Sequence, residues 1–584
     1  MASAGSAPRP AASTVQSFQP DLFTGRATTS VPIIVPPGRK GLQPNLALSY
    51  ASSGRNGWLG IGWSLDVGYI ERSTKNGAPK YTSADSFTFL FQGVSSDLIQ
   101  IPDGTYRAKD EGLFLRFENK GAAGWEVRDP SGTRYLFGQT IASQIESTGK
   151  VFRWALEKVI EVHGNSLTIT YAKDQGQLYL AQITYTDPSP DQQVDFLLEA
   201  RPDVETSYRS GFAVTTAKRL KTVETKATVG ATLQLARRYQ LTYAQSARTN
   251  RSLLTSVQPF GSDGTTSLPA ATFSYQQTAP SWSLTTASQS FKQLLLADVD
   301  GNGTSELMNF EPSSGTWTVS CAQACPGLTT GTWRSGFGTT ASTPVLGDWN
   351  GDAKTDIAIY SSGSWQFALS TGSSFALQSA WNLTFGSGSP LTGDFNGDGH
   401  TDLGTYNVGT WSIALWNGNG FSPASTFSLT WGSSAYDPLT GDFNGDGLTD
   451  IGTVDQPSGI TGVRLSTGST WTGANDWTSA FGGNTPHTSA DLNGDGLTDV
   501  MYYNRAAGQV IYAPSNGSSG FGAPVTLPVT FSQTSTNDFF QLSDVNGDGL
   551  HDPAVFNSLS GSTQLALSQG SLADLLLSVG NGLG

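Results

Sequence analysis

The nonapeptide DFNGDGHTD at residues 394–402 decides the fold of the second half of the chain, because close copies of it occur six times. The copies, called loops 1 to 6 from here on, read DVDGNGTSE (298–306), DWNGDAKTD (348–356), DFNGDGHTD (394–402), DFNGDGLTD (442–450), DLNGDGLTD (491–499) and DVNGDGLHD (544–552). Each loop begins with Asp, carries Asp or Asn at its third and fifth positions, and ends with a carboxylate. Side-chain oxygens at alternate positions of a tight loop can converge on one point, and Gly at the fourth position lets the backbone wrap around that point.

This pattern predicts structural calcium sites, up to six in number. Ca²⁺ prefers hard oxygen ligands, several of them ionised, and a backbone carbonyl at the seventh position would complete the shell. The alternative is an Asn-Gly or Asp-Gly hairpin turn with no metal. A turn needs only its central residues, whereas a metal also needs the carboxylate at the ninth position. The loops are not EF-hands, because β-type sequence follows each loop and no Glu stands at the twelfth position.

The predicted ligands fall into five sets, one for each odd position of the loop. The first position is Asp298, Asp348, Asp394, Asp442, Asp491 and Asp544. The third is Asp300, Asn350, Asn396, Asn444, Asn493 and Asn546, and the fifth is Asn302, Asp352, Asp398, Asp446, Asp495 and Asp548. The seventh, through its carbonyl, is Thr304, Lys354, His400, Leu448, Leu497 and Leu550, and the ninth is Glu306, Asp356, Asp402, Asp450, Asp499 and Asp552.

The spacing of the loops predicts a six-bladed β-propeller over residues 280–572. The loops recur at intervals of about 50 residues, which is the period of a propeller blade. One strand leads into each loop and three follow it, as in SGTWTVS (314–320) and SAWNLTFG (379–386). The last loop lacks an aromatic fourth strand, and PSWSLTTASQSF (280–291) stands unpaired before the first loop. We therefore expect residues 280–291 to join the last blade and close the ring.

Composition supports an all-β protein with two unlike halves. Residues 291–584 hold 5 Lys/Arg and 24 Asp/Glu, whereas residues 1–290 hold 28 and 23. We attribute the acidity of the second half to calcium ligands, and it argues against nucleic-acid binding. No apolar run is long enough for a membrane span. The two cysteines, Cys321 and Cys325, form either a local disulfide or a pair of free thiols.

The first half of the chain is predicted to consist of a disordered segment followed by a β-rich domain. Residues 1–19 are small and polar, which predicts a disordered segment. They also lack the apolar core of a secretory signal. Residues 20–279 alternate as strands with Gly-rich turns. The stretch 153–163 could be a helix, but its Val/Ile content and the Gly164-Asn165 turn favour a hairpin, which makes His163 a turn residue.

The opening of this β-rich domain strongly resembles the Salmonella plasmid virulence protein B family, which is shared with the B component of insecticidal Tc toxin complexes. The motifs that carry the resemblance are Pro36-Pro37-Gly38, PNLALSY (44–50) and GWLGIGW (57–63). The loops are similar to the FG-GAP/VCBS repeats of that family and of integrin α-chains. Residues 573–584 look like the segment that leaves the propeller towards an Rhs-repeat shell, which suggests a fragment or a shortened member.

The resemblance implies a secreted bacterial protein, a structural component of a Tc/Rhs-type toxin. Its propeller would dock on a pore-forming partner and gate the payload, and its N-terminal domain would form part of a shell. The alternative is a carbohydrate-binding adhesin or lectin that stacks sugars on Trp317, Trp365 and Trp411. Tryptophans alternating with Val, Phe and Ile are more often packing residues. A polysaccharide-acting enzyme has only the propeller architecture in its favour.

We predict no enzymatic activity from the sequence. No GxSxG, HExxH or CxxC motif is present, and the E-x-E pair of the ADP-ribosyltransferase carried by some relatives is absent. His400 and His551 fall inside loops, where we expect them to face solvent, and His487 precedes an inner strand.

Overall fold

The computed structural model describes residues 19–20 and 26–581, apart from 187–191, 231, 288–289, 323–327, 474, 478–480, 484 and 571. The protein is all-β, with 52% of its residues in strands and 3% in helix, as the sequence predicts. The helical residues form five short 3-10 turns, Arg39–Gly41, Gly121–Ala123, Ile141–Ser143, Ser379–Trp381 and Ser425–Phe427. No helix in the described residues is long and apolar enough to cross a membrane. The predicted disordered segment 1–19 lies almost wholly outside the described residues.

The first half contains an eight-stranded closed barrel, which the sequence did not predict. Antiparallel pairing runs from β7 to β13 in chain order, passes to β15, and returns from β15 to β7. The strands are β7 (Tyr69–Arg72), β8 (Phe87–Phe91), β9 (Val94–Gln100), β10 (Tyr106–Ala108), β11 (Arg116–Asn119), β12 (Trp125–Arg128), β13 (Arg134–Phe137) and β15 (Lys150–Ile160). Aromatic side chains fill the interior, among them Phe87, Phe117 and Trp125, because inward positions alternate along each strand.

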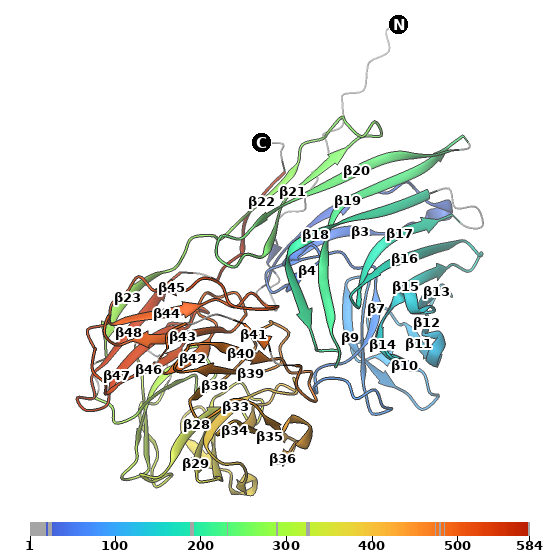
Figure 1. The fold of residues 1–584 in the computed structure, drawn as a ribbon. Helices are drawn as coiled ribbons and strands as arrows, with labels where there is room; N and C mark the ends of the chain where they lie inside the picture. Colours follow the sequence, from blue (N-terminus) through green and yellow to red (C-terminus); the bar gives the residue numbers. More distant parts are fainter. Residues whose placement is uncertain are drawn as a thin grey trace.

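A long antiparallel sheet extends from the barrel at β15 (Figure 1). Its further strands are β14 (Gln144–Ser147), β16 (Ser166–Asp174), β17 (Gln177–Tyr185), β18 (Gln192–Ser207), β19 (Val214–Val229), β20 (Thr232–Gln245), β21 (Ser252–Phe260) and β22 (Ala271–Tyr275). The hairpin predicted around residue 163 is confirmed, since β15 pairs with β16 and His163 is exposed between them. A small sheet of β1 (Gln19–Pro20), β2 (Ala27–Ile33), β3 (Leu46–Ala51) and β6 (Trp63–Ser64) and a hairpin of β4 (Asn56–Gly57) and β5 (Gly60–Ile61) hold the opening motifs.

The last strand of the chain returns to this sheet. β49 (Leu576–Gly580) pairs antiparallel with β22, and the Oγ atoms of Ser274 and Ser578 lie 2.6 Å apart across the pair. In Figure 1 this strand runs beside β22 close to the mark C. Residues 573–584 were expected to lead away from the propeller, and the described part of them forms an integral strand of the first half. From here on, "N-terminal part" means residues 20–279 together with β49.

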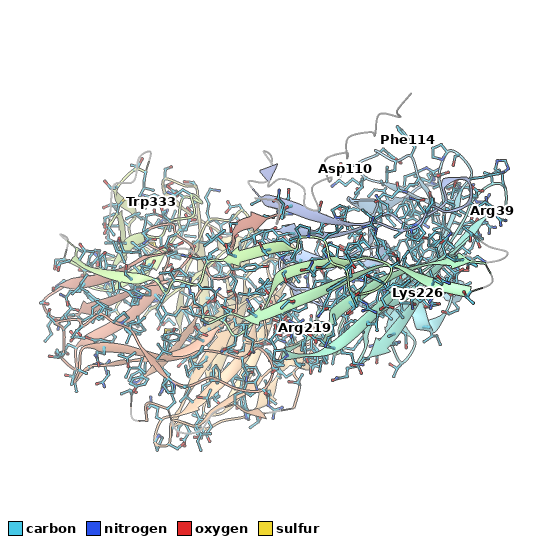
Figure 2. The ribbon with its side chains drawn as sticks, turned by 90° about the horizontal axis from the view of Figure 1, so that it is seen from above. Arg39, Asp110, Phe114, Arg219, Lys226 and Trp333 are labelled. Atoms are coloured by element: carbon cyan, nitrogen blue, oxygen red, sulfur yellow. The ribbon has the colours of Figure 1, made fainter. Side chains whose placement is uncertain are left out.

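The second half, residues 280–572, consists of six antiparallel sheets, four with four strands and two with five, and is called the six-sheet part below. In chain order they are β24–β27, β28–β31, β33–β36, β38–β41, β42–β45, and β46–β48 with β23. In every sheet one loop connects the first strand to the second. The two parts lie side by side, with Trp333 marking one and Arg219 and Lys226 of β19 the other (Figure 2).

The strands of the six-sheet part run from β23 to β48 in chain order. They are β23 (Ser281–Thr286), β24 (Leu294–Ala297), β25 (Glu306–Glu311), β26 (Thr316–Ser320), β27 (Gly331–Arg334), β28 (Thr343–Gly347), β29 (Asp356–Ser361), β30 (Ser364–Ser370), β31 (Phe375–Leu377), β32 (Leu383–Thr384), β33 (Ser389–Gly393), β34 (Asp402–Asn407), β35 (Thr410–Trp416), β36 (Phe421–Pro423), β37 (Leu429–Thr430), β38 (Tyr436–Gly441), β39 (Asp450–Asp455), β40 (Thr461–Arg464), β41 (Asn475–Asp476), β42 (His487–Ala490), β43 (Asp499–Asn504), β44 (Gln509–Ala513), β45 (Val525–Thr526), β46 (Asp538–Ser543), β47 (Asp552–Asn557) and β48 (Thr563–Gln569). The short strands β32 and β37 pair with β30 and β35.

The strand exchange predicted for residues 280–291 is present. β23 pairs along its whole length with β48, from Ser281 opposite Gln569 to Thr286 opposite Gln564. The last sheet therefore takes its fourth strand from the start of the six-sheet part. This pairing joins the two ends of the six-sheet part and covers an edge that would otherwise be open.

Tryptophans on the third strands of three sheets belong to the core. Trp317, Trp365 and Trp411 are fully buried. Each indole N–H donates to the backbone carbonyl of the residue twenty positions later, at 2.8, 3.0 and 3.1 Å. Both the apolar ring and the polar N–H are thus satisfied inside the fold, so these residues pack the sheets.

The pairing of β22 with β49 predicts that a disulfide can be introduced across it. Opposed residues of antiparallel strands hold their Cβ atoms close enough for bridging, and the short Oγ distance identifies Ser274 and Ser578 as suitable positions. We expect the variant Ser274→Cys/Ser578→Cys to cross-link on oxidation, detected as a linked peptide by mass spectrometry after proteolysis. The two single variants are the controls, and a double variant without a linked peptide would contradict this strand pairing.

Candidate metal centres in the six loops

The first carboxylate of each loop organises the turn around itself. In loop 3, Asp394 Oδ1 accepts hydrogen bonds from the backbone N–H of Gly397 and Asp398 at 2.7 and 3.0 Å, and Oδ2 accepts one from Gly399 at 2.8 Å. The same three bonds recur in loops 1, 2, 4 and 5. The backbone must wind tightly to aim three N–H groups at one carboxylate, and Gly397 and Gly399 adopt left-handed φ of 78° and 83° for this purpose.

The ninth carboxylate ties its loop to the strands of its own sheet. Asp402 Oδ2 accepts the backbone N–H of Phe395 at 3.0 Å, and Oδ1 accepts that of Trp416, at the end of β35, at 2.7 Å. Equivalent pairs of bonds hold Asp356, Asp450, Asp499 and Asp552. All five of these side chains are completely buried.

Burial makes these carboxylates costly to ionise without a nearby cation. Burial is the main cause that raises the pKa of Asp402 to about 8 and that of Asp356 and Glu306 to about 7. In loop 4, burial and the neighbouring Asp446 and Asp442 raise the pKa of Asp450 well above its usual range. A divalent cation would reverse this effect, because it favours the ionised form of every carboxylate around it.

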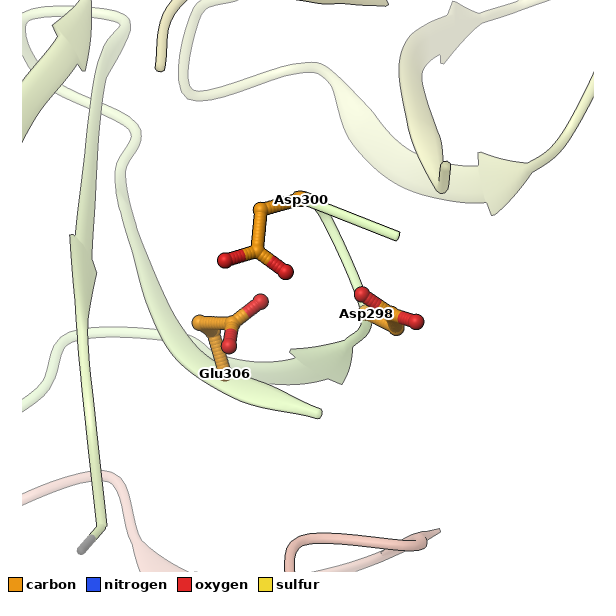
Figure 3. A group of neighbouring side chains, drawn as sticks. All are labelled: Asp298, Asp300 and Glu306. Atoms are coloured by element: carbon orange, nitrogen blue, oxygen red, sulfur yellow. The ribbon is translucent and has the colours of Figure 1, made fainter. Parts of the chain in front are cut away.

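The donor set fits a hard cation such as Ca²⁺. In loop 1, carboxylate oxygens of Asp298, Asp300 and Glu306 lie within 4.8 Å of one another. Figure 3 shows the carboxylates of Asp300 and Glu306 turned towards each other with Asp298 to one side. The other five loops carry Asn at the third position, so there an amide oxygen would join the carboxylates of positions one, five and nine.

Loop 5 has an unsatisfied oxygen of the right kind. The side chain of Asn493, at the third position, is 7% exposed, and neither its Oδ1 nor its Nδ2 has a hydrogen-bond partner. In loops 2, 3, 4 and 6 the matching Asn oxygen accepts the N–H of the fifth residue. A buried amide oxygen without a donor is expected where a metal is its natural partner. Calcium binding at the sequence-predicted ligands remains a proposal.

Hydrogen bonds connect the six loops head to tail in a closed cycle. The residue at the eighth position of each loop donates to the backbone carbonyl of the first residue of the preceding loop. The pairs are Ser305 to Asp544, Thr355 to Asp298, Thr401 to Asp348, Thr449 to Asp394, Thr498 to Asp442, and His551 to Asp491. The backbone N–H donates in the first five pairs, at 2.7 to 2.9 Å, and the ring Nδ1 donates in the last, at 2.9 Å.

A second contact joins each of three loops to a serine at, or just after, the end of the third strand of the next sheet. Ser370 Oγ donates to the carbonyl of Val299, Ser466 to that of Phe395, and Ser515 to that of Phe443, at 2.5, 2.6 and 2.7 Å. Each bond reaches the second residue of the preceding loop. These serines gave no signal in the sequence, because the partner of each lies about 70 residues away.

The prediction that the loop histidines face solvent is wrong. In the third sheet Trp416 stands where the others have serine, and His400 supplies the missing contact: its Nδ1 lies 3.3 Å from the carbonyl of Trp349, and its ring packs on Trp416. His400 and His551 are both half-buried between loops. The side chain of His487, in β42, is buried, and its ring nitrogens lie 3.2 Å from Asp437 Oδ2 and 3.0 Å from the carbonyl of Phe481.

Cys321 is disulfide-bonded. The other cysteine of the chain, Cys325, lies outside the described residues. The predicted Cys321–Cys325 pairing therefore stays a prediction.

Loops 4 and 5 face the N-terminal part across a cavity of about 620 Å³, and loop 3 contacts that part through the carbonyl of Asn396, which accepts the N–H of Ala78. Charged groups of both signs line it, including Arg209, Arg251 and Glu205 from the N-terminal part and Asp446 and Asp495 from the loops. Sequence analysis missed this junction, because nothing in the repeats distinguishes the three loops that meet the other part.

Comparison with known proteins confirms the predicted resemblances. Residues 22–195 match the family described as Salmonella virulence plasmid 65kDa B protein, and residues 348–405 and 394–453 match FG-GAP-like repeats. Curated relatives named mono(ADP-ribosyl)transferase SpvB, from Salmonella choleraesuis and Salmonella typhimurium, are 25% and 24% identical over 226 residues. The match covers 31% of this chain and 38% of those relatives.

Two solved structures share the fold over almost the whole chain. A chain of the Photorhabdus luminescens Tc holotoxin pore superposes with a TM-score of 0.77 at 19% identity, covering 98% of this chain and 31% of that one. A chain of TcdB2-TccC3 gives a TM-score of 0.71 at 19% identity, covering 100% and 34%. This protein thus spans about a third of the chains whose fold it shares.

The prediction that the protein is not an enzyme is wrong in the light of these relatives. The curated relatives are named as mono(ADP-ribosyl)transferases. The prediction rested on the absence of catalytic motifs from this chain, including the E-x-E pair of such transferases.

The serine contacts between loops predict a measurable loss of stability on removal. Ser515→Ala leaves the buried carbonyl of Phe443 without its side-chain donor, which should lower the free energy of unfolding by about 1–3 kcal/mol. Urea unfolding followed by tryptophan fluorescence measures the change. Ser519→Ala, at an exposed position of the same turn, is the control, and equal stability of the two variants would show that the contact contributes nothing.

Proposed function

We propose that the six sheets are the blades of one six-bladed, calcium-binding propeller and that the chain is a structural component of a secreted bacterial toxin complex of the Tc type. The domain limits follow the sequence: a virulence-protein-B-like domain at 20–279 and a propeller at 280–572. The observation that carries the proposal is the agreement in fold with a chain of a Tc holotoxin pore over 98% of this protein.

The propeller arrangement has three further supports. β23 completes the last sheet, so the first and last segments of the six-sheet part share one sheet. The loops form a closed cycle of hydrogen bonds in which loop 1 bonds to loop 6. Apolar clusters bridge neighbouring sheets, as where Leu296 and Leu307 of the first sheet pack with Ala554 and Leu565 of the last.

In this role the propeller docks on a pore-forming toxin subunit and gates the passage of a payload. The N-terminal part, with its barrel and long sheet, contributes to an enclosing shell together with an Rhs-type subunit or segment. A glycan-binding adhesin is the other function that the sequence allows. The burial of Trp317, Trp365 and Trp411 argues against this function, because fully buried indoles cannot stack on a sugar.

Calcium has a structural role in this proposal. An ion in each loop would be held by the oxygens of positions one, three, five and nine and the carbonyl of position seven. It would supply the positive charge that buried carboxylates such as Asp450 and Asp499 require. The residues of the loops already place their N–H groups on those carboxylates, so folding of the turn and binding of the ion favour the same conformation.

Removal of calcium is expected to lower the melting temperature of the protein. Any ligand that binds only the folded state stabilises it, by about 2.7 kcal/mol for a site at a free concentration one hundred times its Kd. Differential scanning calorimetry in calcium and in excess EGTA measures this, with bound ions counted by elemental analysis. Asp402→Asn should bind one ion fewer and melt lower, whereas Glu311→Gln, outside the loops, should behave as the wild type. A melting temperature that does not change after verified removal of metal would refute structural calcium.

Capture of a partner tests the toxin role. We expect the full chain, immobilised and exposed to an extract of the producing bacterium, to retain a large pore-forming subunit in a calcium-dependent manner, identified by mass spectrometry. The control is the same protein after treatment with EGTA. Reproducible binding to a glycan array without capture of any such subunit would favour the adhesin instead.

A further inference from the structure

Three of the six loops are in direct contact with the N-terminal part. In loop 4, Asp446 Oδ2 accepts the backbone N–H of Tyr208 at 2.6 Å, and Asn444 Nδ2 donates to the carbonyl of Thr206 at 3.2 Å. In loop 3, the carbonyl of Asn396 accepts the N–H of Ala78 at 3.0 Å.

Loop 5 is held by arginines of the N-terminal part. Arg248 donates to the carbonyl of Asn493 at 3.0 Å, and Arg251 donates to the carbonyl of Asp495. Arg55 makes the corresponding contact with the carbonyl of Asp446 in loop 4, at 3.4 Å.

These contacts leave the candidate metal ligands available. The arginines bond to backbone carbonyls of the third and fifth positions, whereas the carbonyl that would bind an ion is that of the seventh. In loop 4, Tyr208 occupies only one oxygen of Asp446, and the other accepts the N–H of Leu448 inside the loop. In loop 4 the N-terminal part bonds to Asn444 Nδ2 and Asp446 Oδ2, whereas Asn444 Oδ1 and Asp446 Oδ1 accept hydrogen bonds from within the loop.

Burial separates loops 4 and 5 from the rest. Their third- and fifth-position side chains are 2 to 7% exposed, in Asn444, Asp446, Asn493 and Asp495. In loop 2 the fifth residue, Asp352, is exposed and pairs with Lys354 of the same loop. No hydrogen bond of the described residues links loop 2 to the N-terminal part. Loops 4 and 5 are thus covered by the other part of the protein, and loop 2 offers a matched control.

The positions of the loop atoms that bond to the N-terminal part depend on the conformation of the loop. The carbonyls of Asn493 and Asp495 and the carboxylate of Asp446 lie within three positions of one another in their loops, on backbone that turns around the ion-binding centre. An ion at that centre would fix this backbone. Without it, like charges of Asp442, Asp446 and Asp450 repel one another, as do those of loop 5.

We propose that calcium in loops 4 and 5 secures the N-terminal part to the six-sheet part, so that metal binding at these two loops and docking of the two parts are thermodynamically linked. This inference rests on the calcium binding of the proposed function. Linkage is reciprocal: docking strengthens calcium binding at loops 4 and 5 by the same factor by which calcium strengthens docking. The ions of loops 1, 2 and 6 stabilise their own sheets and leave the junction unaffected.

Hydrogen–deuterium exchange on the full chain tests the linkage. The reporter is the backbone amide of Tyr208, which is protected only while it donates to Asp446. We expect its exchange to accelerate at least tenfold when calcium is replaced by EGTA. Asp450→Asn/Asp499→Asn, measured in calcium, should show the same acceleration, while Asp356→Asn, at the matching position of loop 2, should leave Tyr208 protected.

Counting bound ions in the same samples separates the possible failures. If the wild type binds calcium, but exchange at Tyr208 changes less than twofold in EGTA, the linkage is refuted and the structural role of calcium stands. If Asp356→Asn deprotects Tyr208 as strongly as the double variant, the junction responds to global stability, and the assignment to loops 4 and 5 is refuted. If no calcium binds to the wild type, both the linkage and the calcium sites of the proposed function are refuted.

Discussion

The second half of this protein depends on six carboxylates buried at the ends of its loops. An ionised group removed from water is strongly destabilising unless hydrogen bonds and an opposite charge compensate for it. Asp402 and its four aspartate counterparts obtain the hydrogen bonds from two directions, the second residue of their own loop and the end of the third strand. This requirement fixes the loop against its sheet, and the cycle of bonds between eighth and first positions then fixes each sheet against the next.

The sequence predicts this half well because its information is local and repeated. Six copies of one nonapeptide define the loops and the hairpins, which need only the alternation and spacing of nearby residues. The strand exchange of β23 follows from comparing the copies, because the last one lacks a fourth strand and an unpaired strand precedes the first. The barrel was not predicted, because closure through β13, β15 and β7 depends on partners up to 86 residues apart, as Ala155 is from Tyr69. For the same reason β49 was not predicted, because nothing in its five residues, LLSVG, indicates that they pair with β22. Trp416 and His400 could be interpreted only once the serine of the neighbouring sheets was seen in place.

The uneven distribution of charge along the chain has a second explanation in the folded structure. The sequence places 24 Asp/Glu against 5 Lys/Arg in residues 291–584, and we attributed this to metal ligands alone. The structure brings Arg55, Arg248 and Arg251 of the more basic half against loops 4 and 5. Part of the acidity therefore meets fixed positive charge from the other half. Since these arginines bond to carbonyls, they lower the electrostatic repulsion without replacing the carboxylates' own partners.

The return of β49 to β22 makes the whole six-sheet part an insertion between two neighbouring strands of one sheet. In topological terms, residues 276–575 are a single enlarged hairpin loop, and a few residues of ordinary turn could join Tyr275 to Leu576 instead. Both polypeptide connections between the two halves leave from the same spot. A force that pulls the halves apart thus acts on two adjacent antiparallel strands, at the pair formed by Ser274 and Ser578. Once its other contacts are released, the six-sheet part can rotate about this single pair of connections.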